Sequence, residues 1–342
     1  MGLTLSHEIL ELQTAHPFGI ARGTQSAYRA VWVRVCDSDG TEGWGEANPS
    51  SYYGETADTV VAALARLKPL LAEVADPFDL ETTEWKLWNS LKLNASARAA
   101  ISGALHDLVG KKLGVPVWKL WGLDPAKAPR SSFTIGIDSA DVITAKVREA
   151  APYPILKIKV GTGDDETILK AVRAAAPDKT LRVDANCGWT AKQAIASMPM
   201  LKEYRVELIE QPLQPDDLEG LAMVRRHATV PIIADESCRT AADIPRLAGV
   251  VDGINIKLAK CGSLREALRM IAVARAHHMT VMVGCMIETS IGITQAAHFT
   301  PLLDVVDLDG AALLKNDPFT GATITGGVMK LPTGPGLGVA RR

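Results

Sequence analysis

The feature that most constrains this chain is a regular repeat that runs from about residue 130 to residue 309. Eight short β-rich runs alternate with helical stretches, and each run ends near one polar or small residue: Thr134, Lys159, Asp184, Glu210, Asp235, Lys257, Cys285 and Asp307. The intervals between these positions are 25, 25, 26, 25, 22, 28 and 22 residues. Such a period suits one strand, one helix and two short loops, and eight such units form a parallel barrel. An open doubly wound sheet is the main alternative, but it rarely has eight even units, and no G-x-G-x-x-G follows the first strand.

The repeat stops after the eighth strand-like run. Pro318, Gly321, Gly326 and Gly327 follow in place of a helical pattern. The pattern therefore predicts an α/β fold, a modified TIM barrel of the form (β/α)7β over residues 116–316. We expect residues 317–342 to run back onto the first part of the chain.

The first 115 residues are organised differently. Strand-like runs at 3–14 and 28–36 and a return strand EGWGE precede three helical stretches near 55–73, 79–89 and 95–113. Strands followed by helices predict an α+β capping domain over residues 1–115. Two segments, 19–26 and 48–55, are expected to be exposed loops.

Composition excludes some partners. The chain has 37 Lys plus Arg against 39 Asp plus Glu, so its net charge of −2 gives no reason to expect nucleic acid or an anionic membrane as a partner. Its five cysteines are scattered without a Cys-x-x-Cys spacing, which favours free thiols and a cytoplasmic protein. We see neither a secretory signal nor an apolar run long enough to span a membrane.

Charged residues occupy the inward positions of the predicted barrel strands. In ILKIKV, the aliphatic Leu156 and Ile158 must face the helices, so Lys157 and Lys159 point inward. The same alternation sends inward a set of polar residues from other strands: Arg182, Asp184, Asn186, Glu210, Asp235, Asn255, Lys257, Asp307 and Asp309. Buried charges persist only when they are paired or bind a metal, and they gather here at the C-terminal mouth, where barrel sites lie.

Three of these residues form a candidate metal site. Asp184, Glu210 and Asp235 end three consecutive strands and supply only oxygen ligands. Such a donor set favours Mg²⁺, with Mn²⁺ as a substitute, and disfavours zinc. A cation at this place can bind a substrate carboxylate and stabilise the enediolate that forms when the α-proton leaves.

The lysines suggest proton transfer. Lys157 and Lys159 lie two apart on one face, and their like charges disfavour double protonation, so one of them can act as a neutral base. Lys257 enters from the sixth strand, across the barrel. Two bases on opposite sides of one carbon would invert its configuration, although Lys257 could instead be a counter-ion to Asp235 or Glu210. Lys260 and Glu288 also lie near the mouth, but strand parity or loop position makes them weaker candidates.

The ordered motifs of the barrel resemble a known family. The segments that carry the resemblance are Lys157-Ile-Lys159, Asp184-Ala-Asn186, Glu210-Gln-Pro212, Asp235-Glu-Ser237 and Asn255-Ile-Lys257. They are similar to the motifs of the enolase superfamily, and of its muconate lactonising subgroup in particular, over nearly the whole chain. The resemblance implies the capping domain, the barrel and an isomerase activity. It leaves the reaction open, because the subgroup also contains muconate cycloisomerases, o-succinylbenzoate synthases and N-acylamino acid racemases.

One further motif narrows the reaction. Asp307-Leu-Asp309 resembles the Asp-x-Asp of dipeptide epimerases, whose carboxylates bind the free α-ammonium of a dipeptide. Arg22 resembles the arginine that holds the side chain of a C-terminal glutamate. The resemblance also places Thr134 and Ile287 in the substrate pocket, suggests that Tyr53 helps to close it, and puts Asn186 beside the metal. It implies epimerisation of L-Ala-D/L-Glu in the recycling of cell wall peptides.

Several alternatives stay open at this stage. The chain could epimerise another dipeptide, or catalyse one of the other subgroup reactions, which need no ammonium site. A Schiff-base aldolase is a second class, since barrel lysines can form imines. A catalytically silent dipeptide-binding barrel is the non-enzymatic alternative. Barrels of this type often associate, so a homo-oligomer is also an open expectation.

Overall fold

The computed structural model describes residues 2–342 and begins with an antiparallel sheet of three strands. These strands are β1 (Thr4–Ile20), β2 (Gly23–Cys36) and β3 (Glu42–Ala47). The prediction of an exposed loop at 19–26 was wrong for most of that segment, which belongs to the sheet. Pairing continues to Ile20 and Gly23, so that only Ala21 and Arg22 form the turn of a long hairpin. Polar and glycine residues favour loops, but backbone pairing with the neighbouring strand keeps this segment extended.

Three helices pack on one face of this sheet. They are α1 (Ala57–Ala72), α2 (Leu80–Ser90) and α3 (Ala95–Leu113), close to the predicted ranges. A 3-10 turn, η1 (Ser51–Tyr53), lies in the predicted loop at 48–55. Helix α3 is buried over most of its length against β3, where Gly45 allows the close approach because a Cβ atom there would collide with the carbonyl group of Ala100.

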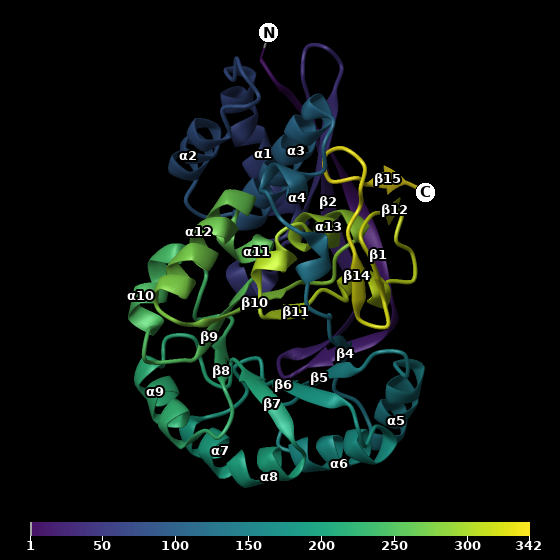
Figure 1. Ribbon diagram of the computed structural model, residues 1–342, viewed down its shortest axis with the longest axis vertical. Coiled ribbons are helices and arrows are strands. Elements are labelled where there is room, and N and C mark those ends of the chain that lie inside the picture. The colour runs from purple at the N-terminus through teal and green to yellow at the C-terminus, as the bar shows by residue number, and fades with distance from the viewer. Residues whose placement is uncertain (1) are drawn as a thin grey trace.

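The second part of the chain is a nearly closed barrel of eight parallel strands, as predicted (Figure 1). Parallel pairing joins them in chain order, and an isolated bridge from Ser131 to Val306 links the last strand to the start of the first. The strands are β4 (Phe133–Ile135), β5 (Ile155–Lys159), β6 (Thr180–Asp184), β7 (Val206–Glu210), β8 (Ile232–Ala234), β9 (Gly253–Ile256), β10 (Thr280–Gly284) and β11 (Val305–Asp307).

Helices cover the outside of the barrel. Seven connections carry them: α5 (Ala140–Glu149), α6 (Asp165–Ala175), α7 (Ala191–Ala196) with α8 (Met198–Glu203), α9 (Leu218–His227), α10 (Ile244–Leu247) after η3 (Ala241–Asp243), α11 (Leu258–Cys261) with α12 (Leu264–Ala276), and α13 (Ser290–Ala297) with η4 (Thr300–Leu302). After β11 there is only a 3-10 turn, η5 (Gly310–Leu313), where the eighth helix would begin. The (β/α)7β form is therefore confirmed.

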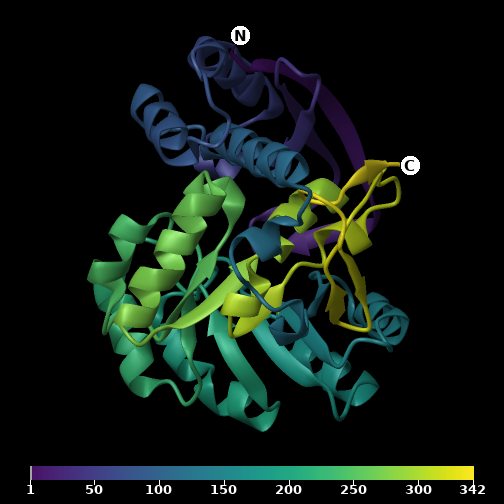
Figure 2. The same ribbon diagram turned by 45° about the horizontal axis from the view of Figure 1, so that its top comes forward.

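The C-terminal tail contacts the first domain (Figure 2). It contains β12 (Phe319–Thr320) paired with β15 (Ala340–Arg341), and β13 (Thr323–Thr325) paired with β14 (Val328–Lys330). Phe319 packs edge-on against Trp32, with ring centroids 5.2 Å apart, and the Leu337 amide donates to Asp107 at 2.7 Å. The segment between the two domains holds α4 (Val117–Leu120) and η2 (Pro125–Lys127). We propose a division at residue 115, with the barrel over 116–316 and the tail 317–342 completing the capping domain.

A small apolar cluster fills the barrel interior beneath the strand ends. Its members are Leu208, Ile233, Met282 and Val305, which occupy the inward positions of four barrel strands.

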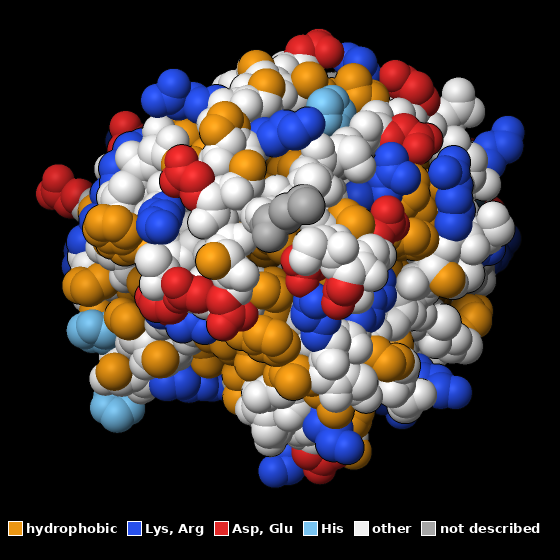
Figure 3. All heavy atoms as spheres, turned by 90° about the horizontal axis from the view of Figure 1, so that it is seen from above, with side chains coloured by type: hydrophobic (Ala, Val, Ile, Leu, Met, Phe, Trp, Pro, Cys, Tyr) orange, Lys and Arg blue, Asp and Glu red, His pale blue; other side chains and the backbone are white. Residues whose placement is uncertain are grey.

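Figure 3 shows acidic and basic side chains interspersed over the capping-domain end of the molecule. Within residues 2–342, the structure has no helix of the length and apolar character that a membrane span requires.

Candidate active site

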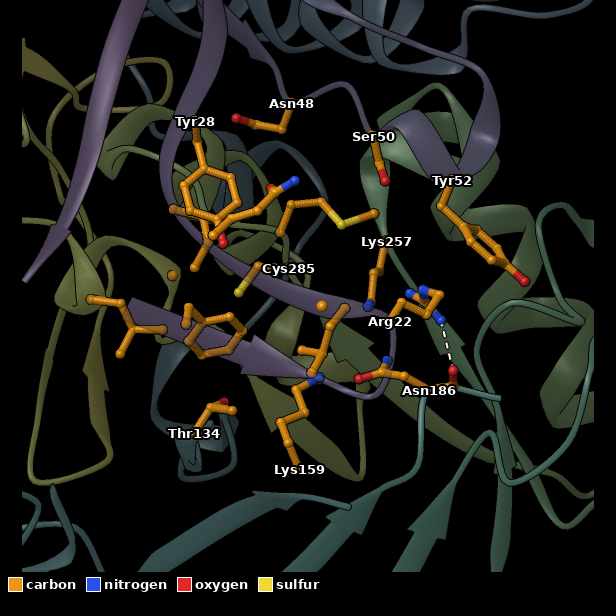
Figure 4. A pocket seen from close by; sticks show the side chains of 18 of the residues that line it. Arg22, Tyr28, Asn48, Ser50, Tyr52, Thr134, Lys159, Asn186, Lys257 and Cys285 are labelled. Atoms are coloured by element: carbon orange, nitrogen blue, oxygen red, sulfur yellow. Dashed lines mark hydrogen bonds between the residues drawn. The ribbon is translucent and has the colours of Figure 1, made fainter. Parts of the chain in front are cut away.

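A cavity of about 550 Å³ lies between the β1–β2 hairpin and the barrel mouth (Figure 4). The far end of the hairpin reaches the barrel, where the Ile137 amide donates to the Gly19 carbonyl at 2.9 Å. Nine of the residues singled out from the sequence line this cavity: Arg22, Thr134, Lys157, Lys159, Asn186, Lys257, Ile287, Asp307 and Asp309. Tyr53 does not line it, whereas its neighbour Tyr52 does. The tyrosine of this loop that lines the cavity is therefore Tyr52, one position before the predicted Tyr53.

The three predicted ligand residues are fully buried beside the cavity. Asp184 ends β6 and Glu210 ends β7, and the strand register pairs these two residues directly. Asp235 follows β8. Strand register thus places Asp184 and Glu210 at the same level of the barrel, and Asp235 lies two residues beyond Ile233, the register partner of Glu210.

Lysine ammonium groups lie among these carboxylates. Lys157 Nζ is 2.7 Å from Glu210 Oε2 and 3.1 Å from Asp184 Oδ2. Lys159 Nζ is 2.7 Å from Asp184 Oδ2, and Lys257 Nζ is 2.7 Å from Asp235 Oδ2. In this arrangement, no three His, Cys, Asp or Glu side chains among residues 2–342 are grouped so as to hold a metal ion.

The donor chemistry nevertheless fits a hard divalent cation. Glu210 Oε2 and Asp235 Oδ2 are buried and make no hydrogen bond of good geometry. Burial would raise the pKa of Asp184, but Lys159 and Lys157 hold it well below its ordinary value, and Lys257 and Lys260 do the same for Asp235. Two ionised carboxylates and a third buried carboxylate at the barrel mouth are the all-oxygen donor set that Mg²⁺ prefers.

Lys157 lies among three carboxylates. Burial lowers its pKa, but Asp307, Glu210 and Asp184 outweigh burial and hold the pKa well above the ordinary lysine value. The sequence left open which of the two lysines stays charged, and three carboxylates from other strands decide this for Lys157. Lys157 is therefore a fixed positive charge under the cavity.

Lys257 pairs with Asp235, as the counter-ion alternative expected, and Asp235 raises its pKa against the effect of burial. It also lines the cavity, so the two roles do not exclude each other. Lys260, which strand parity made a weaker candidate, is completely enclosed. Its ammonium donates to Asp235 Oδ1 at 2.5 Å and to two backbone carbonyls at 2.9 Å, those of Cys238 and Asn255. It therefore anchors Asp235 rather than facing the cavity.

Asp307 and Asp309 both reach the cavity but have different partners. Asp307 accepts from Ser132 Oγ at 2.6 Å and pairs with Lys157 at 2.7 Å. Asp309, two residues beyond β11, accepts from the Thr134 backbone amide at 2.5 Å. Burial and the neighbouring Asp307 raise the pKa of Asp309 to about 7. Asp309 is thus the member of the pair that lacks an ammonium partner among residues 2–342.

The capping side of the cavity is built around Arg22. Its Nη1 donates to the Asn186 carbonyl at 2.8 Å and to Glu236 Oε1 at 2.9 Å, and the ring of Tyr52 lies 4.2 Å from its guanidinium carbon. Asn186 has a positive φ of 43°, which turns its carbonyl toward the hairpin. Its side-chain oxygen makes no hydrogen bond in the described structure.

Sequence reasoning missed several of these residues. Strand alternation gave no reason to select Glu236, because β8 already ends at Ala234 and alternation no longer applies. Tyr28, Asn48, Ser50 and Tyr52 line the capping side and come from segments without a motif. Only the loop predicted at 48–55, which the resemblance connects with the pocket through Tyr53, could have indicated Asn48, Ser50 and Tyr52.

Comparison with known proteins agrees with this geometry. Residues 6–122 match the N-terminal domain of mandelate racemase/muconate lactonizing enzyme, and residues 141–341 match an enolase C-terminal domain-like family. An L-Ala-D/L-Glu epimerase of Bacteroides thetaiotaomicron is 40% identical, with 97% of this chain and 86% of that protein covered. An L-Ala-D/L-amino acid epimerase of a Maribacter species is also 40% identical, over 99% of both chains.

A solved structure extends the likeness to three dimensions. The dipeptide epimerase of Enterococcus faecalis, complexed with Mg and the dipeptide L-Leu-L-Tyr, superimposes with a TM-score of 0.94 at 34% identity over the whole of both chains. Identity at this level over the full length shows common descent as well as a common fold. The chain belongs to the mandelate racemase/muconate lactonizing enzyme family of the enolase superfamily.

Proposed function

We propose that this protein is a Mg²⁺-dependent epimerase that inverts the C-terminal residue of dipeptides by proton transfer through an enediolate. One observation carries the proposal: Lys159 and Lys257 line one cavity from β5 and from the end of β9, beside three buried carboxylates. These strands are four positions apart in an eight-stranded barrel, so the two lysines approach the cavity from opposite sides (Figure 4). The relatives named above support the substrate class.

Asp184, Glu210 and Asp235 would hold the metal ion. When bound, Mg²⁺ supplies positive charge that lowers the cost of removing the α-proton from a substrate carboxylate. Lys157 adds a fixed ammonium on the same side, where negative charge develops. Asn186 lies beside Asp184 and supports the metal site, because its backbone N–H donates to Asp184 Oδ1 at 2.9 Å.

The two lysines move the proton. One of them, as a neutral amine, accepts the α-proton from one face of the carbon. The other, as an ammonium, donates a proton to the opposite face, so the configuration inverts. The α-ammonium of the dipeptide binds near Asp309 and Asp307, while Thr134 and Ile287 form part of the pocket wall.

Arg22 faces the side chain of the residue that is inverted. A guanidinium at this position suits a glutamate side chain, which makes L-Ala-D/L-Glu the first substrate to test. A second candidate is a dipeptide with a neutral or apolar C-terminal residue. The Arg22–Glu236 ion pair and the ring of Tyr52 favour it, because they reduce the net charge and add apolar surface.

We infer a cellular role from this substrate class. Peptides that join L-Ala to Glu occur in the bacterial cell wall, so the enzyme would act in recycling cell wall peptides. The free thiols of all five cysteines support a cytoplasmic location. We also propose that the protein forms a homo-oligomer.

Proton NMR in D₂O tests the function directly. L-Ala-L-Glu is incubated with the protein and Mg²⁺, and the glutamate α-proton signal should disappear while the resonances of L-Ala-D-Glu appear. Lys159→Ala and Lys257→Ala should each abolish inversion, with a loss of about 10²–10⁴-fold or more. The lysine that remains should still exchange the α-proton of one epimer.

The exposed Lys170 of α6 offers a matched control, since Lys170→Ala removes the same group far from the cavity. If the protein exchanges no α-proton in this dipeptide, a library of free dipeptides is screened in the same assay. If the folded, Mg²⁺-loaded protein exchanges no α-proton in any of them, the epimerase proposal is wrong.

A further inference from the structure

Glu236 is a buried carboxylate whose place in the site no motif assigns. It follows Asp235 directly, only 1% of its side chain is exposed, and its Oε1 accepts from Arg22 Nη1 at 2.9 Å. Its other oxygen, Oε2, makes no hydrogen bond in the described residues. A buried carboxylate with a single charged partner fixes that partner strongly, because breaking the pair would leave an uncompensated charge.

The contacts leave one edge of Arg22 available. Nη1 uses its two N–H groups on Glu236 and on the Asn186 carbonyl, and the ring of Tyr52 covers one face of the guanidinium. Within residues 2–342, neither Nε nor Nη2 of Arg22 makes a hydrogen bond. These two nitrogens form the fork that binds a carboxylate through both oxygens. Arg22 therefore lines the cavity with its carboxylate-binding fork unused by the described residues.

The pair also has a consequence for selectivity. A substrate carboxylate at the fork would feel the guanidinium and, slightly farther away, the carboxylate of Glu236. Because these charges oppose each other, the attraction for an acidic side chain is weaker than an unpaired arginine would provide. The hydrogen-bonding edge remains for any side chain with an acceptor atom.

We propose that Glu236 is a positioning residue that orients Arg22 and sets how strongly the enzyme distinguishes acidic from neutral C-terminal side chains. The proposal rests on the function proposed above and deepens it. It assigns the substrate class as dipeptides with a polar C-terminal side chain, charged or neutral, rather than acidic dipeptides alone.

The test compares two isosteric substrates, L-Ala-L-Glu and L-Ala-L-Gln, in wild type and in Glu236→Gln. The variant keeps an oxygen that can accept from Arg22 but removes the opposing charge. The ratio of kcat/KM for the Glu substrate over the Gln substrate should rise about tenfold. Any effect on metal binding or on the lysines acts on both substrates alike and cancels in this ratio.

Glu207→Gln is the matched control, because Glu207 also pairs with an arginine, Arg182, but is half exposed and neither residue lines the cavity. Its ratio should equal that of wild type. A Glu236→Gln ratio within twofold of wild type, or below it, overturns the proposal.

A binding measurement separates this inference from the proposed function. Calorimetry on Mg²⁺-loaded Lys159→Ala protein, with and without Glu236→Gln, gives the ratio of the two dissociation constants without turnover. If wild type binds both dipeptides but inverts neither, the epimerase function fails, while the shift in binding ratio still decides the role of Glu236. If neither dipeptide binds, the role proposed for Glu236 fails as well.

Discussion

The barrel side and the capping side of the cavity are built in different ways. On the barrel side, Lys157, Asp184 and Glu210 are almost completely buried and come from adjacent parallel strands whose register sets their positions. On the capping side, the side chain of Arg22 is one-third exposed and is held by contacts with residues far along the chain. The residues proposed for the reaction thus lie on rigid elements, and those proposed for substrate discrimination lie on a hairpin turn and a loop.

This difference predicts that the two sides of the cavity respond differently to substitution. Substitutions at a barrel strand end disturb several ion pairs at once, because Lys157 alone contacts three carboxylates. Substitutions around Arg22 disturb a few local contacts. We therefore expect the effects on turnover to be large on the barrel side and the effects on selectivity to be concentrated on the capping side.

Removing the metal should have the largest effect. Treatment with EDTA should reduce epimerisation by more than about 10³-fold, because the charge that stabilises the developing anion is lost. Mg²⁺ should restore activity, and Mn²⁺ should substitute for it. Asp235→Asn should show a similar loss that added Mg²⁺ does not reverse. Full activity in EDTA would contradict the assignment of the carboxylates and would favour an imine mechanism.

Substitution of Asp309 should have the next largest effect, and it acts on binding. Asp309→Asn should raise KM for L-Ala-L-Glu by about 10–100-fold, since a charge-assisted hydrogen bond to the substrate ammonium is lost. N-acetyl-L-Ala-L-Glu, which has no ammonium, provides the control and should show no such difference between the two proteins.

The pH dependence of KM sharpens the same prediction. Because the pKa of Asp309 is raised to about 7, its carboxyl is increasingly protonated as the pH falls below 7 and loses its attraction for an ammonium. Wild-type KM for free dipeptides should therefore rise from pH 8 to pH 6, whereas that of Asp309→Asn should stay flat. Parallel profiles would show that another group titrates.

On the capping side, Tyr52→Ala should raise KM for L-Ala-L-Glu about tenfold and change kcat by less than about threefold, because the ring that covers Arg22 is lost while the lysines are untouched. Tyr52→Phe keeps the ring and loses only the hydroxyl, which lies 3.7 Å from Cys187 Sγ. It should behave like wild type in steady-state kinetics. A large fall in kcat for Tyr52→Ala would break the distinction between the two sides.

The smallest effect concerns stability at the boundary between the two sides. Glu288 is buried in the loop after β10, and burial raises its pKa to about 8 from an ordinary 4.5. The folded protein binds this proton more tightly than the unfolded chain, so its contribution to stability is complete below about pH 4.5 and is lost as the pH rises to about 8. Glu288→Gln should be more stable than wild type at pH 9 by about 1–3 kcal/mol, because no buried charge then forms.

Urea unfolding at pH 6 and pH 9 measures this difference. The two proteins should differ less at pH 6, where Glu288 is protonated in the wild type. A variant that is destabilised at pH 9 would mean that the ionised carboxylate stabilises the boundary.

Much of the barrel side was predictable from the sequence. Alternation along ILKIKV places Lys157 and Lys159 inward, and the strand period places Asp184, Glu210 and Asp235 at the ends of three consecutive strands. Which of the two lysines stays charged was not predictable, because the charges that decide it for Lys157 come from strands distant in the chain. The eight strands and the missing eighth helix are also confirmed.

The capping side was less predictable. The segment 19–26 has the composition of a loop, yet pairing between β1 and β2 makes it the end of a hairpin. Tyr52, rather than Tyr53, reaches the cavity because the 3-10 turn η1 sets which ring faces Arg22. Neither result follows from local periodicity.

The sequence by itself determined the barrel, its strand ends and the residue types gathered at its mouth, because strand alternation and a regular period are local properties. Only the tertiary structure decided that Lys157 is held by three carboxylates, that Lys260 anchors Asp235, and that Arg22 is paired with Glu236, which lies 214 residues away. Those contacts depend on how the capping hairpin docks on the barrel and how the strands close into a ring. Residues far apart in the chain become neighbours only through that packing, and their charges then set each other's ionisation and orientation.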